Sequence, residues 1–202
     1  MNEKEWRTSN ETDETRNSSA CTSELEESNW YVLFVQTGKE EFMATRCREL
    51  ISPELLSGAF VPRFQRMFQI RSAWTVKESV LFPGYVFLET DDITSVRNEL
   101  RRIPFFKSLL GRDEDQIHPI YLAEQTRLLQ FLNKDHVIET SSGYKEGDHI
   151  EITAGPLVGH QAEIKRINRH KRTAIVETEL AGKKVKMELG LELGNKTKSS
   201  MK

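Results

Sequence analysis

The side chains in this sequence best suited to chemistry are a run of basic residues near its C-terminal end. Between residues 165 and 172, five positions carry lysine or arginine, one carries histidine and none is acidic. Lys183, Lys184 and Lys186 follow on what we expect to be the adjacent strand of a hairpin, so that all these charges converge on one face. Such a face can neutralise several phosphates of a polyanion. The alternative is a solvated basic turn, because charge runs usually are solvated surface.

A second candidate for function is the aromatic stretch from Leu81 to Leu88. Its second half alternates as a half-buried strand does, and Pro83 and Gly84 interrupt the apolar run just before it. The proline removes a backbone donor and the glycine permits a conformation closed to other residues, so the strand bends there. We expect Phe82 to project beside the sheet as a docking aromatic. The alternative is an ordinary core residue, since apolar strand residues usually are buried.

Nucleophilic or metal chemistry has little support. Cys21 and Cys47 have no paired spacing, so neither a disulfide framework nor a zinc site is implied. Cys47 with a distant histidine would make a thiol nucleophile, but its place on the apolar side of a helix favours a buried, inert thiol. The histidines lack metal-ligand spacing, and no phosphate-cradling glycine loop occurs. We therefore predict a binding protein rather than an enzyme, with no cofactor and no metal.

Charge is distributed unevenly along the 202 residues. Residues 1–29 carry eight acidic and three basic side chains, whereas the chain from Tyr144 to its end carries twelve basic and eight acidic ones. The first segment cannot bury enough apolar surface to offset chain entropy, which predicts a disordered acidic tail. We expect a basic disordered tail at residues 194–202. No apolar run reaches the length of a signal-peptide core or a membrane span, which indicates a cytoplasmic protein.

Strands and helices alternate from residue 30 to residue 132, and these elements must position the aromatic stretch. The segment Trp30–Val35 is apolar and β-branched, which predicts a central strand. Apolar residues at three- and four-residue intervals predict amphipathic helices at 39–51, 93–103 and 121–132. Further strands are expected at 59–64, in the aromatic stretch that ends at Glu89, and at 105–110. Residues 67–80 are expected to form a hairpin or a loose excursion. This alternation predicts an α/β sandwich in which helices cover a sheet.

The pattern changes after residue 132. Residues 133–143 are polar and contain Asn, Ser and Gly, which predicts a flexible linker. Short alternating segments separated by glycine or charged turns follow at 150–153, 162–168, 172–180 and 183–188. They predict a small antiparallel β-barrel. The expected fold class is therefore α+β, an α/β sandwich joined by a flexible linker to a small C-terminal β-barrel.

Two motifs give the chain a resemblance to the NusG family of transcription elongation factors. The N-terminal motif is Trp30-Tyr31-Val32 with Gly38, followed by Phe82-Pro83-Gly84-Tyr85-Val86. The C-terminal motif is Gly147-Asp148 with Gly155-Pro156 and the barrel strands up to Leu193. KOW-like segments also occur in ribosomal proteins, but the two motifs in this order are specific. The resemblance implies an NGN domain at residues 30–132 and a KOW domain at residues 144–193.

The resemblance also implies a protein without catalytic activity that binds bacterial RNA polymerase at the clamp helices of the largest subunit. Phe82 matches the family's docking phenylalanine, and Tyr85, Trp30 and Tyr31 are expected to shape the same pocket. Such a contact places helices against an aromatic anchor, which carries much of an interface's energy. Non-template DNA is a further expected partner, and the protein is expected to be a monomer.

Departures from the family pattern concern the KOW domain. Ala181 stands where housekeeping members show an aromatic that helps to bind a ribosomal protein and the termination factor Rho. Leu157 and His160 stand where phenylalanines are common. A barrel without these aromatics has room for another ligand, and an elongation factor works beside nascent RNA. We therefore predict that RNA binds Lys165, Arg166, Arg169, His170, Lys171, Arg172, Lys183 and Lys184.

The basic KOW hairpin also resembles that of the specialised LoaP-type paralogues, which are antiterminators that recognise an RNA hairpin. The expected function is a factor that binds RNA polymerase through its NGN domain and promotes read-through of terminators. A nascent RNA hairpin, recognised through shape and phosphate contacts, would recruit it. The alternative is a general elongation and termination factor that links RNA polymerase to the ribosome or to Rho.

Overall fold

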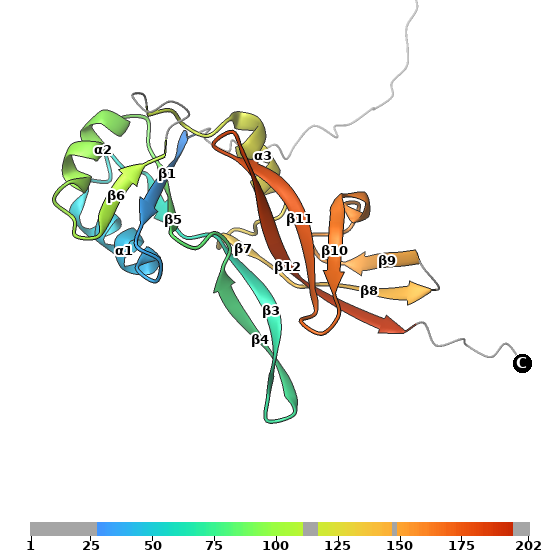
Figure 1. Ribbon diagram of the computed structural model, residues 1–202. Coiled ribbons are helices and arrows are strands. Elements are labelled where there is room, and N and C mark those ends of the chain that lie inside the picture. The colour runs from blue at the N-terminus through green and yellow to red at the C-terminus, as the bar shows by residue number, and fades with distance from the viewer. Residues whose placement is uncertain (1–27, 111–116, 147–148, 196–202) are drawn as a thin grey trace, which may run out of the picture.

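The computed structural model describes residues 28–110, 117–146 and 149–195 (Figure 1). The predicted acidic tail lies outside these ranges except for its last two residues, and so does the predicted basic tail beyond residue 195. No helix in the described residues is long and apolar enough to cross a membrane.

The N-terminal part is built on a four-stranded antiparallel sheet. Its strands stand in the order β2-β5-β1-β6, with bounds β1 Trp30–Val35, β2 Gly58–Phe60, β5 Tyr85–Glu89 and β6 Phe106–Leu109. The predicted central position of Trp30–Val35 is confirmed, because β1 pairs with β5 on one side and β6 on the other. Five of its six residues are buried, as an apolar strand with both faces covered requires.

Two helices, α1 (Glu40–Leu50) and α2 (Ile93–Leu100), pack on one face of this sheet (Figure 1). The side chains of Leu33 and Val35 point to this face and share a buried cluster with Met43 of α1 and Leu100 of α2. Asp92 caps α2, since its carboxylate accepts the Ser95 N–H at 3.0 Å. The predicted helices are therefore confirmed, each ending within a few residues of its expected bounds.

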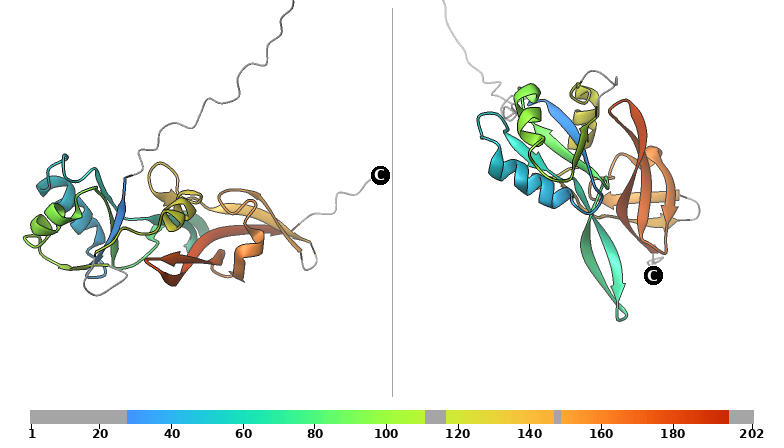
Figure 2. Two further views of the ribbon diagram at one scale, coloured as in Figure 1. Left: turned by 90° about the horizontal axis from the view of Figure 1, so that it is seen from above. Right: turned by 60° about the vertical axis from the view of Figure 1, so that its left-hand side comes forward.

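A hairpin of β3 (Arg63–Ile70) and β4 (Ala73–Val80) projects away from the body of the molecule (Figures 1 and 2). The strand expected at 59–64 is split between two sheets around Pro62, because proline cannot donate to the next ladder bond. Arg71 and Ser72 form the hairpin turn and both have positive φ, as tight hairpin turns require. Nearly all of β4 is exposed.

The predicted linker, residues 133–143, is anchored at its middle. Its strand β7 (Val137–Ile138) pairs in parallel with β3, and Ile138 is fully buried. The last three residues of the predicted linker already belong to β8. The division into domains stays a prediction, but the segment between them is held against the hairpin by backbone pairing.

The C-terminal part is a five-stranded bent sheet, called the half-barrel below. Its order is β10-β11-β12-β8-β9, with bounds β8 Ser141–Glu146, β9 His149–Ala154, β10 Ile164–Asn168, β11 Thr173–Leu180 and β12 Lys183–Asn195. The four predicted strands are confirmed. The expected antiparallel pairing is confirmed for β8–β9, β10–β11 and β11–β12, whereas β8 pairs in parallel with β12. The α+β fold class is confirmed, with helices gathered on the N-terminal sheet and the C-terminal part almost entirely β.

The half-barrel packs closely against the hairpin base through Gly190 of β12. A Cβ atom at Gly190 would lie 2.3 Å from the Gln65 carbonyl oxygen of β3 and 2.7 Å from Thr140 Oγ1. Real Cβ atoms do not approach backbone oxygen so closely, so only glycine permits this crossing of β12 over β3.

Gly190→Ala is expected to destabilise this packing. The added methyl group must push β12 away from a backbone atom, and overpacking of this kind typically costs about 1–3 kcal/mol. Urea unfolding monitored by circular dichroism measures the loss. Gly194→Ala is the matched control, because its new Cβ would meet nothing closer than 3.8 Å. Equal stability of the two variants would contradict the close approach.

Candidate binding surfaces

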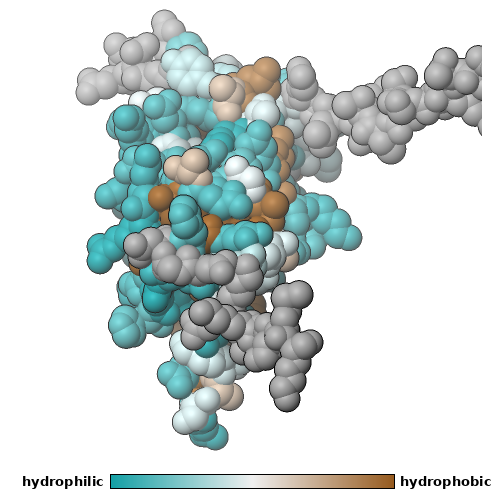
Figure 3. Space-filling model, turned by 90° about the vertical axis from the view of Figure 1, so that its right-hand side faces the viewer, coloured by the Kyte–Doolittle hydropathy of each residue, from teal (hydrophilic) through white to brown (hydrophobic). Residues whose placement is uncertain are grey.

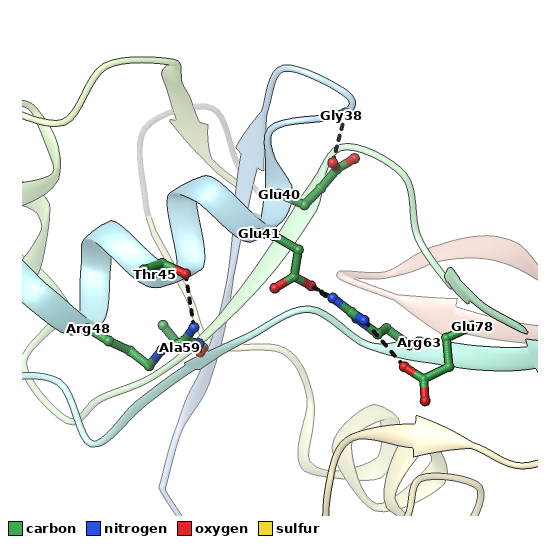
Figure 4. A network of polar contacts seen from close by, with 8 residues as sticks. All are labelled: Gly38, Glu40, Glu41, Thr45, Arg48, Ala59, Arg63 and Glu78. Carbon is green, nitrogen blue, oxygen red and sulfur yellow. Dashed lines mark hydrogen bonds and ion pairs between the residues drawn. The ribbon is translucent and has the colours of Figure 1, made fainter.

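The bend before β5 is fixed by a buried carboxylate. Glu40 of α1 is almost fully buried, and its Oε1 accepts the Gly84 N–H at 2.6 Å. Its Oε2 accepts the Gly38 N–H at 2.7 Å (Figure 4). Gly84 has φ +87°, and its carbonyl accepts the Val35 N–H at 2.9 Å. The predicted bend is therefore present, and a glycine is needed because of the positive φ.

The bend does not expose Phe82 in this structure. Its ring is only 5% exposed and lies 6.1 Å from the ring of Phe87. The expectation of a ring projecting beside the sheet is therefore wrong for this arrangement of the chain. Phe82 lies in an aromatic cluster with Trp30, Phe60 and Phe87, whose ring centroids are 5.0–5.9 Å apart. This aromatic cluster occupies the sheet face opposite α1 and α2.

His136 covers one side of the aromatic cluster. Its ring stacks on Phe60 with centroids 3.6 Å apart and an interplanar angle of 12°. Burial lowers the pKa of His136, against a smaller opposing effect of the Asp135 charge. Burial thus disfavours the charged imidazolium, and a neutral ring suits an aromatic stack.

The two other predicted polymerase contacts fall in different places. Tyr85 is half-buried and packs against the aromatic cluster, with its ring 5.7 Å from Phe34. Tyr31 is buried among the side chains under α1 and α2. Successive strand residues point to opposite faces, so Tyr31 cannot line a pocket with its neighbour Trp30. The expectation that Tyr31 shares the pocket of Phe82 is wrong.

The aromatic cluster continues into the core of the half-barrel. One connected set of buried side chains runs from Phe82 and Trp30 through Leu128 of α3 (Leu122–Leu129) to Leu157 and Leu180. The half-barrel and α3 thus cover the face that the first two helices leave open. Figures 1 and 2 show α3 lying beside the upper end of β11 and β12.

Glu124 of α3 holds the half-barrel against α3 through hydrogen bonds to the turn between β11 and β12. It is 5% exposed, and its carboxylate accepts the N–H groups of Ala181 at 3.1 Å and Gly182 at 2.8 Å. It also accepts the Tyr121 N–H at 3.1 Å within its own capping box. Ala181 and Gly182 both have positive φ, so their N–H groups lie at a two-residue hairpin turn. The backbone of this turn thus contacts α3 directly through Glu124.

Further side chains join the same two parts of the molecule. Arg127 forms an ion pair with Glu163, whose Oε1 also lies 3.0 Å from His160 Nδ1. The His160 ring lies 4.8 Å from that of Phe131. Within the N-terminal part, by contrast, Arg63 of β3 bridges Glu41 of α1 and Glu78 of β4 and so joins the hairpin to α1 (Figure 4). Sequence reasoning missed Glu124 and Arg127, because the only local signal was a carboxylate in the first turn of a helix.

The predicted RNA-binding residues are mostly exposed. Lys165 and Arg166 lie on β10, and Arg169, His170 and Lys171 form the turn to β11. Arg172 is half-buried, because it pairs with Glu192 and covers Trp74 of the hairpin. Seen from the half-barrel side, the molecular surface is mainly hydrophilic with smaller hydrophobic areas (Figure 3). The turn and β10 thus offer a basic surface, called the basic turn below, made of residues 165–172.

Lys183 and Lys184 do not join the basic turn. They stand at the end of β11 and β12 where Leu180 pairs with Lys183, whereas Thr173 follows the basic turn at the other end. Eight strand residues at roughly 3.3 Å each separate the two ends by about 25 Å. Lys184 and Lys186 stand opposite Glu179 and Glu177. The expected convergence of all these charges on one face is therefore wrong.

An exposed patch of rings and cations lies on the N-terminal sheet domain away from the half-barrel. The rings of Phe42 and Phe105 are 5.7 Å apart and both are more than a third exposed. Lys39 Nζ lies 5.3 Å from the Phe105 ring, and the Arg46 guanidinium carbon lies 5.5 Å from the Phe42 ring. We call these four residues the cation–ring patch. Phe105 has φ +71°, an uncommon conformation for a phenylalanine.

Cys47 is not placed to act as a nucleophile. It is fully buried on α1, and burial raises the pKa of its thiol to about 12. The thiol therefore stays protonated at neutral pH. In the described ranges, no group of three or more histidine, cysteine or acidic residues is arranged to hold a metal ion.

Comparison with known proteins agrees with this architecture. Residues 28–129 match the family model described as Transcription termination factor nusG, and residues 146–177 match the KOW motif model. The chain is 24% identical over 173 residues to the transcription termination/antitermination protein NusG of Pasteurella multocida, covering 83% of this chain and 94% of that protein. Identity to NusG of Escherichia coli K12 is 25% over 175 residues, covering 83% and 95%.

A solved structure described as Domain interaction in Thermotoga maritima NusG matches with 22% identity and a TM-score of 0.47, covering 81% of this chain and 94% of that one. The nusG family model alone spans half of the sequence and contains the aromatic cluster around Phe82. The KOW match covers the whole of the basic turn and of β10, and the first part of β11. The chain belongs to the NusG family of transcription termination factors.

Proposed function

We propose that this protein is a transcription antitermination factor that binds RNA polymerase through the aromatic cluster around Phe82 and is recruited by a nascent RNA hairpin bound at the basic turn. The observation that carries the proposal is the coexistence in one NusG-family chain of an aromatic cluster around Phe82 and an exposed basic turn. Its relatives are named termination/antitermination proteins, so both directions of control occur in the family.

Polymerase binding requires a rearrangement of this structure. Phe82 is buried in a cluster that is continuous with the half-barrel, so a partner helix reaches it only after the half-barrel moves away. The aromatic face then becomes an apolar groove with Phe82, Trp30 and Tyr85 as anchors. Aromatic anchors at the centre of a groove carry most of the binding energy of such contacts.

The cation–ring patch is the surface that we propose for the non-template DNA strand. Exposed rings flanked by lysine and arginine suit single-stranded nucleic acid, because bases stack on rings while cations attract the backbone. The patch lies outside the contact with the half-barrel, so it is available in either arrangement of the two parts.

Replacing Lys165, Arg166 and Arg169 together by glutamate is expected to abolish most RNA binding. Each lost phosphate contact reduces the slope of the logarithm of the binding constant against the logarithm of the salt concentration by about 0.7–0.9. Loss of all three contacts should therefore reduce the magnitude of this slope by about two or more. Fluorescence anisotropy with a labelled RNA stem–loop at two salt concentrations measures both effects. Lys183→Glu with Lys184→Glu is the matched control at the far end of β11, and its effect on RNA affinity should be much smaller.

Transcription in vitro across an intrinsic terminator tests the function itself. Read-through that depends on an upstream RNA hairpin leader is expected with the wild-type protein and not with the triple glutamate variant. Termination that is unchanged, or changed equally with and without the leader, would contradict recruitment by RNA. In that case retention of Rho or of ribosomal subunits by the full chain would support the general elongation and termination factor instead.

A further inference from the structure

A small basic notch lies in the half-barrel, lined by residues of β8, β10, β12 and the turn before β11. It encloses about 210 Å³, its cations are Lys145, Arg169 and Arg172, and Ile167, Leu191 and Leu193 contribute apolar walls. The notch opens beside the basic turn, to which Arg169 and Arg172 belong. Several cations around a small cavity form a setting that suits a phosphate group of a nucleic acid backbone.

Arg172 already has two partners at this notch. Its Nη1 atom lies 2.5 Å from Glu192 Oε1, and its guanidinium carbon lies 3.8 Å from the centroid of the Trp74 ring. Trp74 belongs to β4 of the hairpin, whereas Arg172 and Glu192 belong to the half-barrel. The Arg172–Trp74 stack therefore bridges the two parts of the molecule, close to the point where Gly190 of β12 crosses β3.

The interactions of Arg172 with Glu192 and Trp74 are both weak. The Glu192 side chain is half exposed and the Trp74 ring is 38% exposed, and exposed ion pairs and cation–π contacts are weak. A phosphate offers arginine two strong, charge-assisted hydrogen bonds in one plane. Arg169 stands beside it and forms no ion pair with any residue in the described part of the chain. A phosphate that enters the notch thus competes with Trp74 and Glu192 for the same guanidinium.

We propose that Arg172 is shared between RNA and the hairpin, so that an RNA phosphate in the notch draws it away from Trp74 and loosens the hairpin from the half-barrel. This inference rests on the RNA binding proposed above and names the residue through which that binding is communicated. Thermodynamic linkage makes the effect reciprocal: if RNA weakens the Arg172–Trp74 contact, removal of that contact must strengthen RNA binding by the same factor.

Trp74→Ala is therefore expected to raise the affinity for a short RNA stem–loop by about two- to fivefold, which corresponds to the strength of an exposed cation–π contact. The exposed position of Trp74 on the hairpin makes unfolding of the variant unexpected. Val76→Ala is the matched control, because Val76 is exposed on the same face of β4 and has no aromatic ring on which Arg172 could stack. Its RNA affinity should equal that of the wild type, whereas Arg172→Gln should bind RNA more weakly.

A second readout follows the contact directly. Addition of the stem–loop should change the tryptophan emission of the wild type, and Trp74→Phe should lose that change. An affinity of Trp74→Ala that is unchanged or lower, with RNA binding still lost in the Lys165, Arg166 and Arg169 triple variant, would overturn the sharing of Arg172 alone. Failure of the wild type to bind the stem–loop, or undiminished binding by the triple variant, would overturn the proposed function as well.

Discussion

Phe82→Ala should lower the affinity of this protein for RNA polymerase by about thirtyfold or more. Central aromatic anchors typically contribute about 2 kcal/mol or more to an interface, and the other rings of the aromatic cluster cannot replace the one that fits the partner. Binding of the labelled protein to polymerase free of nucleic acid measures the effect. Phe105→Ala is the matched control, since it removes an exposed ring far from the aromatic cluster.

The burial of Phe82 requires a second variant. Truncation of a buried phenylalanine to alanine also costs about 3–5 kcal/mol of folding stability, so a weak binder could simply be an unfolded one. Phe82→Leu keeps most of the apolar volume and removes the ring. Thermal unfolding checks both variants, and full polymerase affinity in folded forms of both would exclude Phe82 as the anchor.

Glu124→Ala is expected to release the half-barrel from α3. The variant leaves the N–H groups of Ala181 and Gly182 without their carboxylate. Hydrogen bonds to a charged group contribute about 1.5–3 kcal/mol each, so docking should weaken by about 3 kcal/mol or more. If most molecules have the half-barrel docked on α3, only the rare released form can bind polymerase. Weaker docking makes the released form common and raises the apparent polymerase affinity by up to about a hundredfold.

Amide hydrogen exchange at residues 181 and 182 measures the release directly, and polymerase binding measures its consequence. Glu177→Ala removes an exposed carboxylate of the same strand β11 and should change neither. Combining Glu124→Ala with Phe82→Leu should remove the gain in affinity, since the released face then lacks its anchor. Slow exchange at both amides in Glu124→Ala would show that docking depends on other contacts, such as the Arg127–Glu163 ion pair.

The two predictions together describe a molecule in which the half-barrel covers the proposed polymerase-binding face, the aromatic cluster around Phe82. The carboxylate of Glu124, the glycine crossing at Gly190 and the Arg172–Trp74 stack all act between the same two parts. Each contact is modest, so the docked arrangement can be reversed by ligands of ordinary strength. The basic turn lies at one edge of this contact and the aromatic cluster lies beneath it, so both proposed ligands, RNA and RNA polymerase, would favour the released form.

Local sequence determined most elements of this protein and pointed to its candidate binding residues. The apolar run Trp30–Val35 could only be a buried strand, and the period of the apolar residues placed the helices. Pro83 and Gly84 indicated the bend before β5, because proline lacks a backbone N–H donor and glycine readily adopts a positive φ. The basic turn was equally visible, since an uninterrupted run of cations needs no partner to be recognised.

Only the tertiary structure decided which of these residues meet. Trp30 and Tyr31 are neighbours in sequence but lie on opposite faces, and only the packing of helices on one face tells which face remains for Phe82. The pairing register of β11 and β12 places Lys183 and Lys184 at the end of these strands away from the basic turn. Glu124 meets Gly182 across 58 positions. Contacts at such separations depend on how whole elements dock, and no local pattern of residue types carries that information.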